Sequence, residues 1–516
     1  TAESSQNGYL AFFVQDDFRV RSNLSLNVGL RLDHELATTE RFNRSVSGFD
    51  FTSPSPISSA ARAAYARNPL PELPASQFVV NGGLLFPTSS SRSLFQTPAV
   101  NVGPRFGISW APAALGGKTV IRGGTGVFFF PINGVGTGID QTGFSQQTLL
   151  VSSLDGNLTP YATLANPFPD GIQVPSGTAQ GLATYLGKSI GYTSYHLKTG
   201  YSYRWNFDVQ RQFAHDIVVE IGYEGNHGVH LPLSRSLAVV PAQYLSASPF
   251  RDQTTIDSLT ANVTNPFAGL IPGTTLNGST VQRQQLLQAF PQFTGLTERS
   301  TPQGASYFDL FQARVEKRFS HGFQVLANFL DSKLLERRSF LNPQDAMPEK
   351  RISADDRPWR FVFSANWDLP LGKGRILGGW TANVIATLQP GPPLAWGNVI
   401  YLGGDLHSDP RNIYQAFDVT RFNRNSSQQL ANNLRTFPSQ FTTLRADGVN
   451  NLDLSVIKNV PITEKLRLQL RGEFFNSLNH PEFNPANLSP TSTAFGTITS
   501  QANLARATQV ALRLIW

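Results

Sequence analysis

The segment GGKTVIRGGTG, residues 116–126, is the stretch whose composition comes nearest to a phosphate-binding loop. Such a loop has the pattern G-x-x-x-x-G-K-T between a strand and a helix, so that backbone N–H groups surround the phosphate oxygens. In this chain Pro112 stands where the first glycine is required, and Lys118 opens a strand-like segment. The pattern therefore favours a turn between two strands over a nucleotide site.

Histidine and aspartate side chains occur twice at spacings that suggest a metal ion. His227 and His230 are three residues apart, so on a strand they point to opposite faces and cannot easily share an ion. Asp405, His407 and Asp409 offer alternating oxygen and nitrogen ligands for a divalent cation, although polar loop turns often have this composition. We predict no metal and no cofactor, and a loop cation site stays open as an alternative.

Motifs that would support catalysis are missing from the sequence. No GxSxG, HExxH or paired-carboxylate arrangement occurs in a suitable context. The chain has no cysteine, which excludes disulfides, thiolate zinc sites and cysteine nucleophiles. We predict that the protein is not an enzyme.

Arginines are placed regularly along segments that alternate between apolar and polar residues. Eight of them fall at the alternate positions that hold polar residues, which would form one face of the strands: Arg31, Arg105, Arg204, Arg314, Arg360, Arg467, Arg471 and Arg513. Seven carboxylates fall on the same polar face: Asp33, Asp208, Glu220, Glu316, Asp368, Asp453 and Glu473. We favour a network of ion pairs that braces a wet interior. The alternative is a surface that guides a polar or anionic substrate, and the two functions can coexist.

The overall composition limits the class of protein. The formal net charge is +7, but the basic residues are mostly single arginines along apparent strands, so we predict no nucleic-acid partner. No run of about 18 apolar residues exists, which excludes membrane-spanning helices. The chain starts at Thr1, has Met347 as its only methionine and opens with no signal-like segment, so we expect a mature or truncated product.

Long alternating segments are the elements that would position these arginines. In residues 8–33, Phe12 and Val14 fall on one face while Gln15 and Asp17 fall on the other, and the pattern repeats after a short turn near Ser22. Five more such hairpins follow, with short turns near Ala114, His215, His321, Gly374 and Ile462. Strands of about 9–11 residues suit a tilted bilayer crossing, whereas strands of globular proteins are usually shorter.

The connections between hairpins are long, polar and rich in glycine and proline: residues 37–100, 131–199, 232–306 and 392–449. Short turns on one side and long loops on the other are typical of outer-membrane barrels, in which the turns are periplasmic and the loops extracellular. Aromatic residues at the short-turn ends would form an interfacial girdle: Trp110, Phe213, Phe319, Trp367 and Trp516. We predict an all-β transmembrane antiparallel barrel with about 13–14 long strands over residues 1–516, and disfavour a large soluble β-protein.

The last ten residues, ATQVALRLIW, are predicted to be the closing strand. Val510, Leu512 and Leu514 would face lipid, and Trp516 would lie at the periplasmic interface. The alternating face with a terminal aromatic resembles the signal that the barrel assembly machinery recognises. Six hairpins and this strand make thirteen strands, so the first strand would start outside the cell and upstream strands would be missing.

Several motifs in order resemble the barrel of TonB-dependent outer-membrane transporters, specifically the Oar-like group. They are FVQDDFRVRSNLSLNVGLR, NVGPRFGISWAP, YRWNFDVQRQF with GYEGNHGVHL, FQARVEKRFSHG, DDRPWRFVFSANWDLPLGKGR, GGWTANV and RGEFFNSLNHPEFNPAN. The resemblance covers nearly the whole chain except the loops. It implies a 22-strand barrel, an internal plug that the arginine face would receive, a segment near the N-terminus that contacts TonB, and uptake powered by the inner membrane.

The sequence departs from that family at its beginning, because no plug, TonB box or β-sandwich domain precedes Thr1. The chain would then be the C-terminal portion of the barrel, in the outer membrane of a Gram-negative cell. Its partners would be outer-membrane lipid, the TonB complex through the missing N-terminal region, and the assembly machinery. We expect energised uptake of a large or scarce substrate. The alternatives are a passive porin and a surface protein that uses its long loops for adhesion or assembly.

Overall fold

The computed structural model describes residues 3–134, 138–146, 150, 152, 158–169, 171–172 and 174–516. The predicted loop 131–199 therefore lies partly outside the described residues. Fifteen strands of the described part form one sheet, and thirteen of these follow one another along the chain as antiparallel neighbours. These thirteen are β1 (Ser5–Arg21), β2 (Leu24–Glu40), β5 (Asn101–Trp110), β6 (Thr119–Phe129), β8 (Tyr201–Gln212), β9 (Ile217–Ser236), β12 (Gly295–Ser320), β13 (Phe323–Arg337), β15 (Trp359–Asp368), β16 (Trp380–Gln389), β19 (Val449–Pro461), β20 (Arg467–Phe475) and β21 (Ala507–Ile515). The predicted all-β fold with about thirteen long strands is confirmed.

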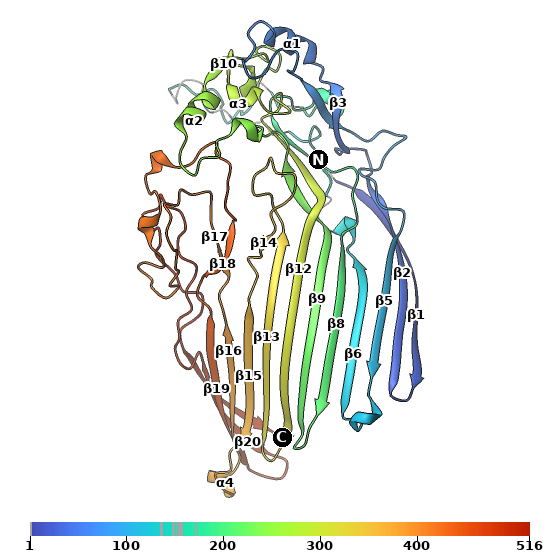
Figure 1. The fold of residues 1–516 in the computed structure, drawn as a ribbon, viewed down its shortest axis with the longest axis vertical. Coiled ribbons are helices and arrows are strands. Elements are labelled where there is room, and N and C mark those ends of the chain that lie inside the picture. The colour runs from blue at the N-terminus through green and yellow to red at the C-terminus, as the bar shows by residue number, and fades with distance from the viewer. Residues whose placement is uncertain are drawn as a thin grey trace.

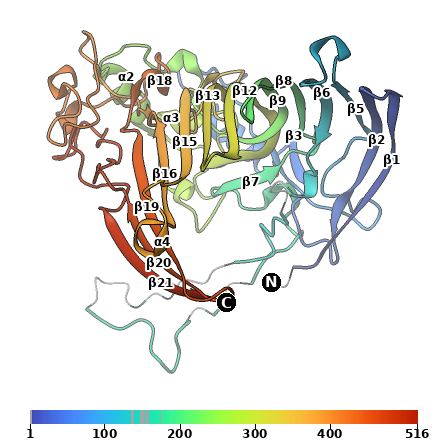
Figure 2. The ribbon, with the colours of Figure 1, turned by 90° about the horizontal axis from the view of Figure 1, so that it is seen from below.

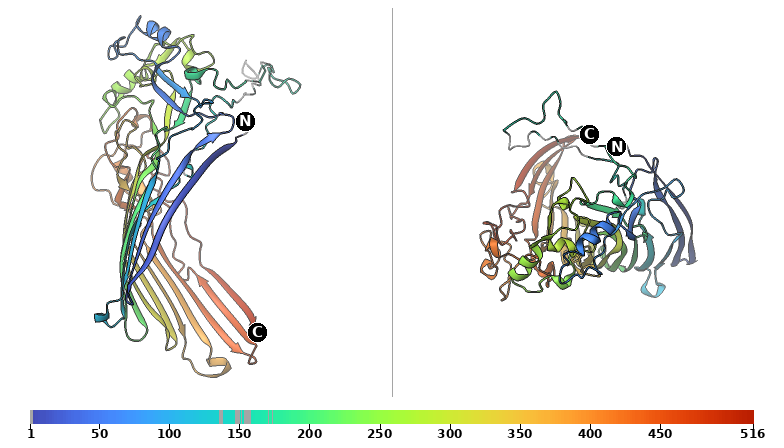
Figure 3. Two further views of the ribbon diagram at one scale, coloured as in Figure 1. Left: turned by 90° about the vertical axis from the view of Figure 1, so that its right-hand side faces the viewer. Right: turned by 90° about the horizontal axis from the view of Figure 1, so that it is seen from above.

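The thirteen strands make a tall, curved wall. Figure 1 shows them side by side, with short turns at the lower end and the longer connections at the upper end. Seen from below, the wall bends into an open arc whose two edges are β1 and β21, and these two strands are not paired with each other (Figure 2). The N-terminus lies toward the loop end and the C-terminus at the turn end (Figure 3). The first strand thus starts at the loop end, and β21 ends at the turn end.

The six short connections occur where the sequence predicted them. The residues between β1 and β2 are only Ser22 and Asn23, and those between β12 and β13 are only His321 and Gly322. His321 and Gly322 both have positive φ, as in a type I′ hairpin turn. The connection from β15 to β16 is longer and contains α4 (Gly374–Leu377).

The long connections carry the remaining elements of the described chain. The short strands are β3 (Gly48–Pro54), β4 (Asn81–Leu85), β7 (Ser189–Thr193), β10 (Asn262–Thr264), β11 (Thr280–Gln282), β14 (Arg351–Ile352), β17 (Pro393–Ala395) and β18 (Gln440–Arg445). The helices are α1 (Ser58–Tyr65), α2 (Gln253–Thr260) and α3 (Arg283–Leu286), with 3-10 turns at 132–134, 181–183, 242–244, 275–277, 419–421 and 426–428. A further 3-10 turn, at 113–115, lies in the short connection between β5 and β6. No helix in the described ranges has the length and apolarity needed to cross a membrane.

Two predicted loops have wrong boundaries, and the first of them, placed at 37–100, begins too early because β2 runs to Glu40. The sequence placed a loop at 232–306, but β9 continues to Ser236 and β12 already begins at Gly295, with Glu298 opposite Arg235. The extra residues are polar and bulged, so they lack the apolar alternation that marks a strand facing lipid. Backbone pairing continues there because hydrogen bonding between strands does not depend on that alternation.

The buried core belongs to the loops and not to the wall. One cluster gathers residues of the three long connections before β12, including Phe78, Phe267 and Phe293, which are almost fully buried. Apolar residues of the wall are exposed by comparison: Phe12 is 71% and Val510 is 74% exposed. A wall with so much exposed apolar surface needs an apolar environment other than its own core.

Candidate functional site: the polar face of the wall

The register of the strands divides the wall into two faces. Val14 lies opposite Leu30, and Leu30 lies opposite Pro104, so apolar residues line up across strands on one face. One residue further along, Gly29 lies opposite Arg105 and marks the other face. We call these the apolar face and the polar face.

All eight arginines singled out from the sequence lie on the polar face by this register: Arg31, Arg105, Arg204, Arg314, Arg360, Arg467, Arg471 and Arg513. The seven carboxylates of the same parity lie there too: Asp33, Asp208, Glu220, Glu316, Asp368, Asp453 and Glu473. The aromatic residues Trp110 and Trp367 are on the apolar face at the turn end, 42% and 49% exposed. The two faces therefore differ sharply in chemistry.

Three of these arginines are held by carboxylates. Arg314 Nη2 lies 2.7 Å from Glu316 Oε2, and Arg314 Nη1 lies 3.9 Å from Glu220 Oε2 on the neighbouring strand. Arg31 and Arg471 contact the acid two residues further along the same strand, Asp33 at 2.8 Å and Glu473 at 3.1 Å. The three arginine side chains are partly exposed, so each pair contributes only a modest stabilisation.

The sequence analysis missed a fourth pair on this face. Arg122 Nη1 lies 3.7 Å from Asp208 Oδ2 and donates a hydrogen bond to Gln210. Arg122 was missed because β6 is rich in glycine, so its alternation is hard to read. Its position opposite Asp208 follows from the register.

Two arginines of the polar face, Arg105 and Arg204, have no acidic partner in the described part of the chain. The guanidinium carbons of Arg105 and Arg204 lie 4.7 Å and 5.2 Å from the ring centroid of Phe128, which lies on the strand between them. Among the residues that the structure describes, no carboxylate oxygen is within 4.0 Å of either guanidinium. Arg105 Nε is buried and has no hydrogen-bond partner among the residues that the structure describes. We call Arg105, Arg204 and Phe128 the arginine patch.

Local sequence explains why the two cations approach one ring. Gly126 is the residue opposite both Arg105 and Arg204, and it has no side chain to occupy the space between them. A Cβ at Gly126 would lie 3.2 Å from Arg105 Cγ and 3.1 Å from Phe128 Cε2. The guanidinium of Arg204 is oriented by a hydrogen bond that its Nε donates to Ser202 Oγ at 2.7 Å.

The chemistry of the patch is that of an anion site. Guanidinium groups bind carboxylates and phosphates through paired N–H donors, and an aromatic face adds a favourable contact to each cation. A volume of about 580 Å³ opens over the patch, lined also by Asn206 and Asn226. Glu224 lines the same space and would oppose anions at one edge.

The remaining arginines of the polar face are more dispersed. Arg360, Arg467 and Arg513 have no carboxylate within 4.0 Å among the described residues. They lie on β15, β20 and β21, away from the arginine patch in the order of strands.

The histidine and aspartate candidates do not converge. The ring of His227 stacks on Tyr307 at 4.3 Å, while His230 packs edge-on against Tyr201. Asp405 pairs with His407 at 2.9 Å, and both side chains are more than 80% exposed. No group of three potential ligands was found in the described part of the chain.

The remaining candidates lie in turns. Asp409 accepts a hydrogen bond from the backbone N–H of Arg411 in its own turn. The glycine-rich segment at 116–126 is a turn that leads into β6, and no helix follows it.

The C-terminal strand lies at the edge of the wall. Val510, Leu512 and Leu514 lie opposite Gly472, Leu470 and Leu468 on the apolar face. Their exposed fractions are 74%, 68% and 48%, and Trp516 beyond them is 88% exposed.

Solved structures with a similar fold are outer-membrane receptors and transporters. The ferripyoverdine receptor of Pseudomonas aeruginosa bound to ferripyoverdine is 9% identical with a TM-score of 0.40, covering 99% of this chain and 39% of that one. The unliganded ferric citrate transporter FecA is 8% identical with a TM-score of 0.43 and coverages of 99% and 45%. The transporter YddB from Escherichia coli is 9% identical with a TM-score of 0.40 and coverages of 99% and 54%.

The chain thus spans about two fifths to just over half of the length of these three proteins. No curated protein sequence matches it. A family model does: the outer membrane beta barrel domain matches residues 1–509. This chain therefore belongs to that family of outer-membrane proteins.

Proposed function

We propose that this chain forms the larger part of the wall of a TonB-dependent outer-membrane transporter of the Oar-like group. Such a transporter takes up a large or scarce substrate with energy from the inner membrane. The observation that carries the proposal is the breadth of the wall, thirteen long strands with one continuous polar face. Barrels of about 8 strands are filled by side chains, whereas wide barrels of about 22 strands enclose a lumen that a plug closes.

The open edges support the assignment of residues 1–516 to the C-terminal part of such a barrel. In lipid, the backbone groups of β1 and β21 that face away from the sheet would be unpaired, which costs several kcal/mol for each group. Further strands that pair with both edges would remove that cost. A total of 22 strands would need about nine more.

The polar face would line the lumen and receive the plug. Its ion pairs, such as Arg314 with Glu316, brace the wall, while the arginine patch attracts polar or anionic groups. Contact with the TonB complex would be made by a region outside residues 1–516.

The C-terminal strand would carry the signal for the barrel assembly machinery. Its apolar side chains and terminal Trp516 support this role. Leu512→Asp places a charge among side chains that face lipid, where charged groups are unfavourable, and should reduce insertion. Ala511→Asp, on the polar face next to it, is the matched control and should insert at nearly normal levels. Equal amounts of heat-modifiable barrel for both variants would argue against the assignment.

The proposal is tested on the full-length protein in its own outer membrane. Energised uptake predicts that the purified protein shows no steady ion conductance in planar bilayers and that a TonB fragment co-purifies with it. A stable, open conductance without TonB binding would favour the passive porin instead. Neither conductance nor TonB binding, together with loss of cell–cell contact on deletion of the gene, would favour the surface adhesin.

A further inference from the structure

The connection between β16 and β19, residues 390–448, has its own hydrophobic core. Trp396, Phe417 and Phe422 are at most 5% exposed and pack together with Phe495 from the last loop. The Trp396 and Phe422 rings are stacked at 5.1 Å with an interplanar angle of 3°. The floor of this region is therefore buried and aromatic.

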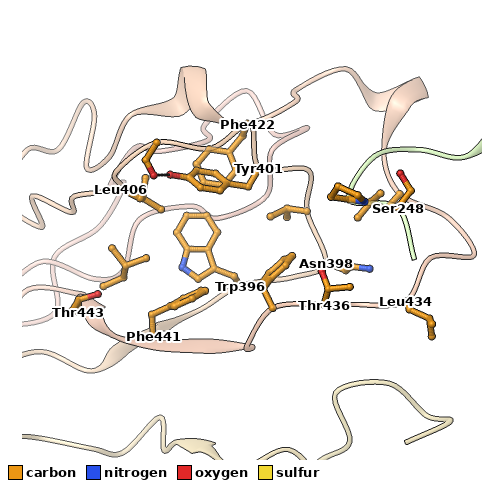
Figure 4. Close-up of a pocket in the computed structure, with 16 residues that line it drawn as sticks. Ser248, Trp396, Asn398, Tyr401, Leu406, Phe422, Leu434, Thr436, Phe441 and Thr443 are labelled. Carbon is orange, nitrogen blue, oxygen red and sulfur yellow. Dashed lines mark hydrogen bonds between the residues drawn. The ribbon is translucent and has the colours of Figure 1, made fainter. Parts of the chain in front are cut away.

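A cavity of about 440 Å³ lies on this core (Figure 4). Its size falls within the range of small-molecule sites, about 300–1,000 Å³. Aromatic rings from Trp396, Tyr401, Phe422, Phe437 and Phe441 contribute to the lining, and none of the lining residues is charged. In a chain with a net charge of +7 and many loop arginines, an uncharged lining selects against ionic ligands.

The mouth and the floor of the cavity differ. Trp396 and Leu444 are buried, whereas Asn398, Thr436 and Thr443 are exposed and present neutral polar groups. A ligand that fits has an apolar ring for the floor and an uncharged polar group.

One polar atom of the floor has no partner. Trp396 is 5% exposed, and its Nε1 makes no hydrogen bond within the described residues. Figure 4 shows this nitrogen on the edge of the indole that faces Phe441 and Thr443, both of which line the cavity. The ring is held by the Phe422 stack and by the backbone, where Trp396 N donates to Ser439 O at 2.9 Å. An indole N–H only donates, and buried donors are almost always satisfied.

We infer that this cavity binds a small, uncharged aromatic molecule that carries an oxygen acceptor, with the ring against Trp396 and Phe422 and the acceptor on Trp396 Nε1–H. Aromatic rings stack or pack edge-on against such a floor, and the acceptor pairs the buried donor. The site lies in a loop, so it does not depend on the transport proposed for the barrel.

The probe for the test is acetophenone, an uncharged aromatic ketone, and the comparison compound is ethylbenzene, which has the ring without the acceptor. The protein in lipid nanodiscs is labelled with 5-fluorotryptophan, and the ¹⁹F signal absent from Trp396→Phe is that of Trp396. We expect acetophenone to shift this signal saturably, and ethylbenzene at equal free concentration to bind about tenfold more weakly.

Three variants separate binding from partition into lipid. Trp396→Phe, read by ligand-observed NMR, should lose the preference for the ketone while still binding the ring. Leu434→Trp fills the cavity from its rim and should abolish binding of both compounds, with folding checked by heat-modifiability. Trp367→Phe, on the apolar face of the wall, is the matched control and should bind like the parent. Equal affinity for both compounds, or unchanged binding by Leu434→Trp, would overturn the inference.

Discussion

Two stretches of the polar face carry the same residue type in different surroundings. Around Arg314, two carboxylates lie within 4.0 Å of one guanidinium. Around Phe128, two guanidiniums share one ring, and no described carboxylate lies as close. In the first stretch the positive charge is fully compensated by carboxylates, whereas the second keeps an uncompensated positive charge. The residues on neighbouring strands thus decide whether an arginine of the polar face stabilises the wall through an ion pair or can bind an anion.

The largest expected effect concerns anion binding at the arginine patch. The double variant Arg105→Gln with Arg204→Gln should bind citrate about a hundredfold more weakly than the parent, because two charge-assisted contacts are lost. Isothermal titration of the full-length protein at low salt measures the affinity. Arg314→Gln is the matched control and should bind citrate as the parent does. A similar loss of citrate affinity in Arg314→Gln would show that binding depends on the total positive charge of the polar face and not on the arginine patch.

The second effect is on stability, and here we expect Arg314 to matter more than Arg204. Arg314→Gln leaves Glu220 and Glu316 without their cation and should lower the unfolding free energy by about 0.5–1 kcal/mol, since the pairs are partly exposed. Arg204→Gln removes a cation from beside another cation and should cost less. Urea unfolding of both variants checks the order. If Arg204→Gln were the more damaging of the two, the patch would be a structural brace.

A smaller effect tests the space that Gly126 leaves. Gly126→Ala adds a methyl group about 3 Å from Arg105 and Phe128, so one of them must shift. We expect citrate affinity to fall a few-fold while the barrel still assembles. Gly107→Ala, whose nearest neighbour would be 3.4 Å away, serves as the control glycine on the same face. Unchanged citrate binding by Gly126→Ala would mean that the patch tolerates another geometry.

The smallest expected effect concerns a carboxylate that lies in a loop and not on the polar face. Glu482, in the last loop, has a pKa raised above 4.5 by burial and then by the negative charge of Asp447, against the opposing charge of Arg357. A raised pKa means that the folded loop prefers the protonated form. The loop is therefore fully stable below about pH 4.5 and loses some stability as the pH rises through the raised pKa.

Hydrogen exchange of residues 476–506 as a function of pH measures that loss. Protection, corrected for intrinsic exchange, should fall as the pH rises, and Glu482→Gln should flatten the curve. A parent curve as flat as that of the variant would remove Glu482 from the account.

The sequence was sufficient to predict the strands of the wall and their two faces, but not the side-chain contacts on the polar face. Alternation over nine or more residues is imposed by lipid on one side and water on the other, so the parity of Arg471 or Leu512 could be read directly. Whether Arg105 finds a carboxylate depends on which residue of the next strand lies opposite, and that register is set by turns and bulges. Above the lipid the alternation fades, which is why the ends of β9 and β12 were misplaced.

The loops were beyond prediction for a related reason. Their structure rests on contacts between residues far apart in sequence, without a repeating pattern. Arg445 Nη2 lies 2.6 Å from Asp356 Oδ2, and the Asp356 side chain is buried. The cavity at Trp396 likewise combines residues near 248 with others from 396 to 444.

The account rests on the assignment of the apolar face to lipid and the polar face to an aqueous lumen. The chain has no cysteine, so single cysteines along β20 can test this without background. In the assembled barrel, a small charged thiol reagent should modify cysteines at Gln469, Arg471 and Glu473. It should leave those at Leu468, Leu470 and Phe474 unmodified. The opposite parity, or equal modification at all six positions, would contradict the central claim.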